Sequence, residues 1–482
     1  MKTIFSEYLP ETVHLDEVFE VDNGIKGMYK PLVEKFNDFS ETDYIYLNDE
    51  AKKSFFNQGI TFAVYNENES QEKIFPFDLF PRIIHSEEWN KLEKGIEQRS
   101  WALNEFIKDI YGDQKILKDK FIPKDLVFSS KNYLKEMQGI VPIGGIYNHI
   151  SGTDLIKHRD GKFYVLEDNI RCPSGVSYVI SNRMAMKKML YGVFNEFNVE
   201  PVVGYPESLL NMMESVKPEN VDEPVCALLT PGMYNSAYFE HSYLAQRMGI
   251  ELVEGRDLFV ENDFVYQKTI HGPQKVDVIY RRVDDDFLDP KVFNPKSVLG
   301  VPGIFNAFAK GNVSLINAPG TGFADDKAVY SYVPEIVKYY TGEDSILNNV
   351  QTYRCSEEKE YQYVMENIKD LVIKPVDEAG GYGVTIGSKL TKKEIEDVKN
   401  IVKNNRRKYI AQPIMSLSVH ATFIEDSECF EPRHVDLRSF SLLGKDQQFV
   451  LKGGLTRVAL KKGNLIVNSS QGGGSKDTWV LK

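Results

Sequence analysis

"GTDLIKHRDGKFYVLEDN", residues 152–169, has the pattern of two strands that meet at Asp160-Gly161, a dipeptide that favours a two-residue hairpin turn. A turn of that kind pairs Arg159 with Lys162. Counting outward from this pair places Asp154 opposite Glu167, with about 5 Å between their Cβ atoms. The hairpin therefore predicts two carboxylates side by side.

Strand alternation extends this group to an amide. Side chains two residues apart share a face, so Asn169 points the same way as Glu167. The predicted faces are Phe163, Val165, Glu167 and Asn169 on one side, and Tyr164, Leu166 and Asp168 on the other.

Two facing carboxylates repel each other unless a cation lies between them. Carboxylate and amide oxygens are hard ligands, which suit Mg²⁺ better than Zn²⁺. We therefore predict a metal site at Asp154, Glu167 and Asn169. The alternative is an exposed hairpin whose acids are balanced by His158, Arg159 and Lys162.

Composition limits the function classes. The chain has 482 residues, 42% hydrophobic and 27% charged, which is typical of a globular protein with two or three domains. Its net charge is −12 and it has no long Lys/Arg cluster, so we expect no nucleic-acid or membrane partner. We expect a cytoplasmic location, since no signal-peptide pattern or long apolar stretch occurs. The four widely spaced cysteines predict reduced thiols.

The rest of the chain alternates helix and strand patterns. Residues 59–65 predict a strand and residues 104–117 a helix. Residues 225–254 follow a strand, helix, strand order, which predicts a βαβ unit. The helix pattern of residues 326–342 contains Pro334, which predicts a break or kink.

A lysine and a glycine-rich loop follow one another in "LVIKPVDEAGGYGVTIG", residues 371–387. The strand end would hold the Lys374 ammonium, and Gly380 and Gly381 would let backbone N–H groups approach a phosphate. The alternative is an ordinary glycine-rich hairpin. Lys327 follows Asp325 and Asp326 at a predicted helix start, where a cation gains from an anionic partner.

Two arginines lie in predicted strands, Arg438 in "VDLRSFSLL" and Arg457 in "GGLTRVAL". A guanidinium suits phosphoryl groups because it binds two oxygens at once, although a structural salt bridge is its commoner role. Lys476 belongs to a glycine-rich tail that is no Walker A loop, because Asp477 follows it. We interpret this tail as a candidate active-site loop.

A charged cluster follows another predicted strand, in "YRRVDDDFLDP", residues 280–290. Arg281, Arg282 and Asp285 are candidates for substrate binding. The alternative is an internal network of ion pairs.

The combination of these motifs resembles the ATP-grasp ligases. Asp154, the Glu167-x-Asn169 pair and Pro173-x-Gly175 are similar to their magnesium-binding end, while Lys327 and Lys374 resemble their two nucleotide lysines. Here the metal strand precedes the lysines, which is the reverse of the usual order. Nearly the whole chain therefore resembles circularly permuted ATP-grasp proteins of the glutathionylspermidine synthetase type.

The resemblance implies an α+β to α/β architecture, with a circularly permuted ATP-grasp fold and an additional Rossmann-like (pre-ATP-grasp) βαβ subdomain. The implied segments are an N-terminal α/β region (1–140), the metal-binding part (141–190), the Rossmann-like substrate subdomain (191–315) and the nucleotide-binding subdomains (316–482).

The resemblance also implies roles for individual residues. Mg²⁺ would lie at the predicted metal site. Lys327, Lys374, Gly380, Gly381 and Lys476 would contact ATP, with Gln412 at the adenine hinge. Arg457, assisted by Arg438, would stabilise the transferred phosphoryl group. Some relatives have an arginine where this chain has Gly152, so that task falls more heavily on Arg457, Arg438 or Lys476.

The implied activity is an ATP-dependent carboxylate–amine ligase that works through an acyl phosphate and releases ADP and phosphate. Its partners would be a small-molecule or peptide carboxylate and an amine, and the sequence sets no oligomeric state. The alternatives are a non-catalytic ATP- or peptide-binding module and a small-molecule kinase. Cys172, beside the metal strand, is a bystander in this interpretation.

Overall fold

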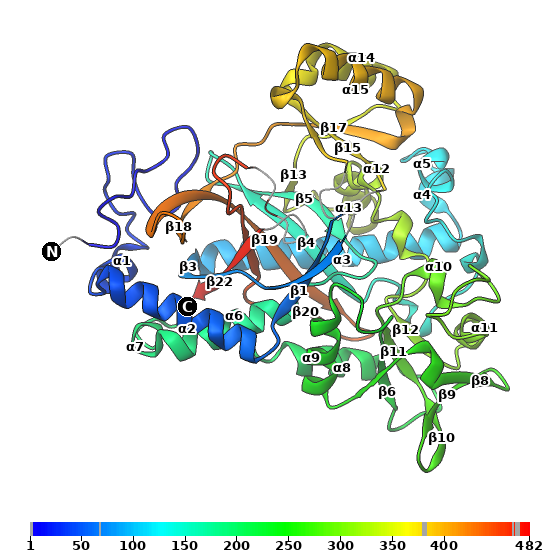
Figure 1. Cartoon of the computed structure of the whole chain (residues 1–482). Coiled ribbons are helices and arrows are strands. Elements are labelled where there is room, and N and C mark those ends of the chain that lie inside the picture. The colour runs from blue at the N-terminus through cyan, green and yellow to red at the C-terminus, as the bar shows by residue number, and fades with distance from the viewer. Residues whose placement is uncertain (1–2, 67–68, 378–382, 465–466, 468–472) are drawn as a thin grey trace.

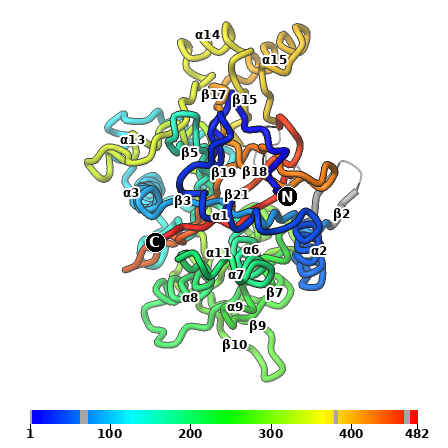
Figure 2. The backbone as a smooth tube through the Cα atoms, turned by 90° about the vertical axis from the view of Figure 1, so that its left-hand side faces the viewer, coloured from blue at the N-terminus to red at the C-terminus, as the bar shows by residue number. Residues whose placement is uncertain are grey.

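The chain forms a central sheet with a smaller unit on either side (Figure 1). The structure, a computed structural model, describes residues 3–66, 69–377, 383–464, 467 and 473–482. Figure 2 shows the unit around α14 and α15 above the central sheet and the unit around α8 and α9 below it. This arrangement agrees with the predicted mixture of helices and strands.

In the part of the chain that the structure describes, the central sheet has nine strands drawn from distant segments. Its main path runs β13, β5, β4, β19, β21, β22 and β3, and β18 and β20 pair with β19. The pairing of β22 with β3 is parallel and joins the last strand to residues 77–85. The bounds are β3 (Phe77–His85), β4 (Ile150–Lys157), β5 (Phe163–Asn169), β13 (Asn348–Asn349), β18 (Val419–Ile424), β19 (Cys429–Leu443), β20 (Gln448–Val450), β21 (Leu455–Val458) and β22 (Gly474–Leu481).

Helices α3 (Ser86–Tyr111) and α6 (Val176–Met189) pack against this sheet. In α3 the buried residues Trp89, Leu92 and Ile96 recur every three or four positions, so they form one apolar stripe. The stripe packs on Leu155 and Val165 of the sheet. Helix α3 therefore covers one face of the β4–β5 hairpin.

The predictions for the N-terminal part are confirmed in one case and corrected in another. The strand predicted at 59–65 is β1 (Thr61–Asn66), which pairs with β2 (Glu69–Ile74). The helix predicted at 104–117 is divided at Gly112 between α3 and α4. The other α-helices in the described part of residues 1–140 are α1 (Lys30–Phe36), α2 (Glu41–Asn57), α4 (Lys115–Lys118) and α5 (Lys124–Phe128), and α7 (Tyr191–Phe194) follows α6.

The predicted βαβ unit is confirmed. Strand β6 (Cys226–Leu229), helix α9 (Tyr238–Met248) and strand β7 (Glu251–Val253) follow one another, and the two strands are parallel. Helix α9 ends at Gly249, whose φ of 69° suits glycine. Strands β11 (Val278–Arg281) and β12 (Ser314–Ile316) complete a parallel sheet of order β12-β11-β6-β7. Around it lie α8 (Tyr205–Ser215), α10 (Asp285–Leu288), α11 (Ile304–Ala309) and the sheet of β8 (Leu258–Glu261), β9 (Phe264–Thr269) and β10 (Gly272–Val276).

The upper unit has its own sheet of order β14-β17-β15-β16 and its own hydrophobic core. Its elements are β14 (Tyr353–Arg354), α14 (Glu358–Asn367), β15 (Leu371–Pro375), β16 (Thr385–Ile386), α15 (Lys392–Asn404) and β17 (Tyr409–Pro413). The predicted break near Pro334 is confirmed, since α12 (Lys327–Tyr330) and α13 (Val333–Thr341) are separate helices.

The central sheet takes strands from three of the four predicted segments, since β3, β4 and β19 come from residues 1–140, 141–190 and 316–482. The four-segment division stays a prediction. Within the described ranges, no helix has the length and apolar character needed to cross a membrane.

Candidate active site

The β4–β5 hairpin pairs Asp154 with Glu167, as predicted. The next pairs toward the open end are Thr153 with Asp168 and Gly152 with Asn169. Directly opposed residues of antiparallel strands share a face, so the two carboxylates lie on the same side of the sheet.

The predicted turn, however, is wrong. The His158 N–H donates to the Lys162 carbonyl, so the loop contains three residues and Gly161 takes a φ of 77°. The register then shifts, because Leu155 pairs with Val165 while Asp154 pairs with Glu167. One extra residue in β5 thus offsets the longer turn and restores the predicted acidic pair.

The predicted faces are also wrong near the turn. Val165 packs in the cluster under α3, and Asp168 forms a buried ion pair with Arg99 at 2.6 Å. Tyr164, by contrast, packs in another cluster with Ile156. The extra residue moves the alternation by one position. Glu167 and Asn169 therefore share a face with Tyr164 and not with Val165.

Asp154 is fully buried and is bound by two arginines. Arg438 lies opposite it on β19, with its Nε 2.6 Å from Asp154 Oδ1 and its Nη2 2.9 Å from Oδ2. Arg457 Nη2 also donates to Asp154 Oδ2 at 2.7 Å. Burial acts to raise the pKa of Asp154, but the two guanidinium groups outweigh it and hold that pKa below its usual range.

Arg457 binds a second carboxylate. It lies opposite Asp436 on β19, and its Nε is 2.8 Å from Asp436 Oδ1. Burial raises the pKa of Asp436 while Arg457 lowers it, and the net change is a rise. Asp436 was not among the residues predicted from the sequence. Its only signal is its place in a strand two residues before Arg438, which puts both side chains on one face.

The two predicted nucleotide lysines lie near Glu167. Lys327 Nζ is 3.3 Å from Glu167 Oε2, and the α12 N-cap is Asp326, as the sequence predicted. Lys374, at the end of β15, donates from Nζ to Gln412 Oε1 at 2.6 Å. Burial and Lys327 lower the pKa of Lys374 and Glu167 raises it, with a net value of about 8. Two lysines from different elements thus converge on one carboxylate.

Glu167 and Asn169 have the chemistry of magnesium ligands. Asn169 Nδ2 donates to the Gly152 carbonyl at 3.1 Å, which leaves its Oδ1 for another partner. Both residues line a small cavity together with Lys327. Asp154 differs, since both of its oxygens accept from arginines. Among the described residues, no three His, Cys, Asp or Glu side chains form a metal-binding group. The donor set therefore fits a hard cation at Glu167 and Asn169, with Asp154 beside them.

Lys476 lies apart from this group. It is fully buried, and its Nζ contacts the Asp78 carboxylate and donates to the Phe80 and Ala421 carbonyls. Its neighbour Ser475 pairs with Arg457, so Lys476 points to the opposite face of the sheet. These contacts disfavour a contact between Lys476 and ATP, which stays a prediction. Trp479, near the end of the tail, is buried.

Arg281 and Arg282 are buried and Asp285 is partly buried, and all three contact other groups of the protein, so substrate binding by them stays a prediction. Arg281 donates to the Asn317, Val283 and Ala318 carbonyls, and its Nη2 is 2.7 Å from Asp285. Arg282 Nη1 donates to the Pro173 carbonyl at 2.7 Å. Their side chains are thus occupied by the protein, which agrees with the ion-pair alternative.

The contact of Arg282 with Pro173 is one of several that hold the loop after β5, and these were not predicted from the sequence. Glu240 of α9 is buried, and its Oε2 accepts from the Gly175 N–H at 2.7 Å and the Ser177 N–H at 3.1 Å. Arg438 donates to the carbonyl of Ser174 in the same loop at 3.2 Å. The loop that follows β5 is therefore held by both the βαβ unit and the central sheet. No local motif signals these contacts, since they join distant segments.

Two other predictions concern the glycine-rich loop and the cysteines. Gly380 and Gly381 lie outside the described residues, although the flanking strands β15 and β16 pair antiparallel as predicted. The four cysteines are free thiols, as predicted. Burial raises the pKa of Cys172, which disfavours a thiolate nucleophile there.

Comparison with known proteins agrees with this geometry. The chain matches the family "Circularly permuted ATP-grasp type 2" over residues 81–459. It is 49% identical to an uncharacterized protein of Synechocystis sp. (strain ATCC 27184 / PCC 6803 / Kazusa), over 97% of both chains. It is 39% identical to a Frankia casuarinae protein named "Putative glutamate--cysteine ligase 2-2", over 88% of this chain and 48% of that protein.

A solved structure shows the same fold. It is a glutathione synthetase-like effector, GSS30, from Globodera pallida in its apo form, with a TM-score of 0.59 and 12% sequence identity. The match covers 92% of this chain and 98% of the effector. With the family match over most of its length and the strand order described above, the chain belongs to the circularly permuted ATP-grasp family.

Proposed function

We propose that the protein is an ATP-dependent ligase that joins a carboxylate to an amine through an acyl phosphate. The observation that carries the proposal is the row Glu167, Asp154 and Arg438, which are paired on three adjacent strands. Lys327 lies beside Glu167 at one end of this row, and Arg457 lies beside Arg438 at the other. Such an arrangement can bind a polyphosphate at one end and a transferred phosphoryl group at the other.

The nucleotide phosphates would lie on Lys327 and Lys374. Lys374 has a pKa of about 8, so a bound phosphate would favour its charged form. Gln412 fixes the direction of the Lys374 ammonium through its Oε1 and is itself held by Thr352. A magnesium ion held by Glu167 and Asn169, with Asp154 beside them, would neutralise charge on the phosphate oxygens.

The arginines would act on the reacting groups. A substrate carboxylate oxygen attacks the γ-phosphorus, the bond to the bridging oxygen breaks, and ADP leaves. The amine nitrogen then attacks the acyl carbon, the bond to the phosphate oxygen breaks, and phosphate leaves while the amine loses a proton to solvent. Arg438, whose side chain is 16% exposed, is placed to contact the transferred group, whereas the more buried Arg457 positions Asp154.

The relatives support a ligase. The Frankia protein is named as a glutamate–cysteine ligase, and the Globodera protein is described as glutathione synthetase-like. The Frankia name concerns the joining of two amino acids, and the Globodera structure supports the fold alone. We extend that reaction class to this chain as part of the proposal, with ATP and Mg²⁺ as the cofactors.

The test measures ADP, phosphate and substrate mass together. The purified protein is incubated with Mg-ATP, a pool of candidate acids and a pool of candidate amines, with each pool also omitted in turn. The proposal expects ADP and phosphate in equal amounts, together with a product joined by loss of water. A stable phosphorylated product without an amide would favour a kinase, and the absence of ADP in every mixture would favour a binding module.

A further inference from the structure

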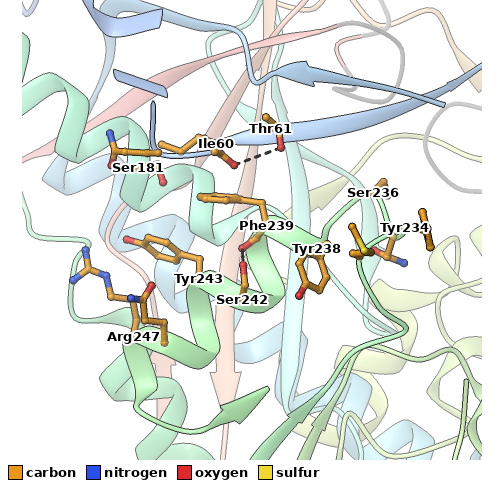
Figure 3. A pocket seen from close by; sticks show the side chains of 15 residues that line it. Ile60, Thr61, Ser181, Tyr234, Ser236, Tyr238, Phe239, Ser242, Tyr243 and Arg247 are labelled. Atoms are coloured by element: carbon orange, nitrogen blue, oxygen red, sulfur yellow. Dashed lines mark hydrogen bonds between the residues drawn. The ribbon is translucent and has the colours of Figure 1, made fainter. Parts of the chain in front are cut away.

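A cavity of about 1110 Å³ lies between the N-terminal region and the βαβ unit. Its walls come from the end of α2, the start of β1, helix α6, the loop after β6 and helix α9. Figure 3 shows Phe239 and Tyr243 of α9 facing Ile60 and Thr61 across it. Of the predicted site residues that the structure describes, none lines this cavity, so it is distinct from the group around Glu167.

The cavity lies where open parallel sheets bind ligands. In the order β12-β11-β6-β7, the chain goes from β6 to β7 on one side and then returns to β11 on the other. Ligands of such sheets bind beyond the carboxyl ends of the strands at this reversal. Residues 233–236, which follow the carboxyl end of β6, line the cavity.

The lining favours an anionic ligand with an amphipathic body. Rings of Tyr238, Phe239 and Tyr243 lie beside hydroxyl groups such as those of Ser181 and Ser242. Among the described lining residues, Arg247 is the one with a charged side chain. Its guanidinium lies over the Tyr243 ring, 5.3 Å from the centroid, which holds it toward this wall.

The length of helix α9, which forms one wall of the cavity, indicates the length of the ligand. Tyr238 and Arg247 stand at opposite ends of α9, and a helix rises by 1.5 Å per residue, so they are about 13 Å apart along its axis. An extended peptide spans about 3.3–3.6 Å per residue. A chain of about four residues therefore reaches from Arg247 to Tyr238.

The Tyr238 end of α9 is linked by hydrogen bonds to the row of Glu167, Asp154 and Arg438. Glu240, two residues further, accepts from the Gly175 N–H, and the Ser174 carbonyl of the same loop accepts from Arg438. Tyr178 of α6 packs near Phe239, with their ring centroids 5.5 Å apart, and donates to the Thr61 carbonyl. One wall of the cavity is thus connected through a single loop to Arg438, one of the two arginines that bind Asp154.

From these observations we infer that the cavity is the amine-substrate site and takes a short peptide, with its terminal carboxylate on Arg247 and its amino end toward Tyr238. This inference rests on the proposed ligase function, in which an amine must approach the acyl phosphate. The nitrogen forms the new C–N bond as phosphate leaves, so its end of the peptide must lie nearest the loop held by Glu240.

The test is an affinity selection with two tetrapeptide libraries that lack Asp and Glu, one with free carboxyl termini and one with amidated termini. We expect the full chain, without nucleotide, to retain the carboxylate library about tenfold more strongly, the difference that one charge-assisted contact supplies. Arg247→Gln should abolish that preference. Arg256→Gln is the matched control, because Arg256 is exposed, pairs with Glu254 and does not line the cavity.

Equal retention of both libraries, or an unchanged preference in Arg247→Gln, would overturn the inference. A retained peptide should also raise ADP release, with Arg247→Gln raising its KM and leaving kcat unchanged. The two proposals can be contradicted separately. Selective retention of peptides without any ADP release would contradict the ligase proposal but support a peptide site. Amine-dependent ADP release without selective retention would support the ligase proposal but contradict the peptide site.

Discussion

Arg457 joins two buried carboxylates, with its Nη2 2.7 Å from Asp154 Oδ2 and its Nε 2.8 Å from Asp436 Oδ1. Its positive charge is shared between β4 and β19, so the arginine is part of the fold as well as of the candidate site. Arg438 binds only Asp154 among these carboxylates and is more exposed. The two arginines therefore predict different mutant phenotypes.

Arg457→Met should destabilise the protein more than Arg438→Met. The first change leaves Asp436 buried without its guanidinium partner, which costs about 3–5 kcal/mol for a broken buried pair. The second leaves Asp154 with Arg457. Chemical denaturation of both variants measures the difference, and equal midpoints would contradict the assignment of Arg457 to two partners.

Glu167→Gln should leave the fold intact and lower ADP release by at least about a hundredfold, as loss of one site charge commonly does. The Glu167 side chain is 20% exposed and pairs with Lys327, so the amide fits the same space. Glu251→Gln, at an exposed position of β7, is the control. Retained turnover in Glu167→Gln would refute its role at the phosphate end.

Asp168→Asn, one residue further along β5, should destabilise the fold, unlike Glu167→Gln. Asp168 is buried and accepts three hydrogen bonds from Arg99, with Nη2 at 2.6 Å. Removing its charge leaves Arg99 unpaired, so we expect a loss of about 3–5 kcal/mol in the free energy of unfolding. A thermal melt beside that of Glu167→Gln tests this. An unchanged melting temperature would show that the pair contributes little.

The neighbouring residues Glu167 and Asp168 show what the sequence could predict. Alternation and charge pairing were enough to place Glu167 with Asp154, even though the turn has three residues and the strand one extra. The side of the sheet taken by Asp168 depends on that extra residue, and no local pattern marks it. The partners of Lys476 come from β3 and β18, far away in the chain, so strand register decided its position.

The cavity of Figure 3 could not be predicted for the same reason. Its walls combine residues 58–61, Ser181 and residues 233–247, and none of these segments carries a motif alone. The βαβ unit was predicted from its apolar strands and its terminal glycine. The position of α9 against α6 depends on packing between distant segments, which periodicity does not specify.

Nucleotide affinity should fall as the pH rises through about 8. The pKa of Lys374 is lowered from the ordinary lysine value of 10.5 to about 8, so its ammonium is mostly charged at pH 7 and mostly neutral by about pH 9. A bound phosphate favours the charged form, and linkage then requires weaker binding wherever the free protein has lost that proton. Titration of a fluorescent ATP analogue across this range measures the effect. Lys374→Arg, which keeps its charge, should bind with little pH dependence, whereas Lys374→Met should bind weakly throughout. An identical pH profile in the wild type and in Lys374→Arg would show that Lys374 does not hold the phosphates.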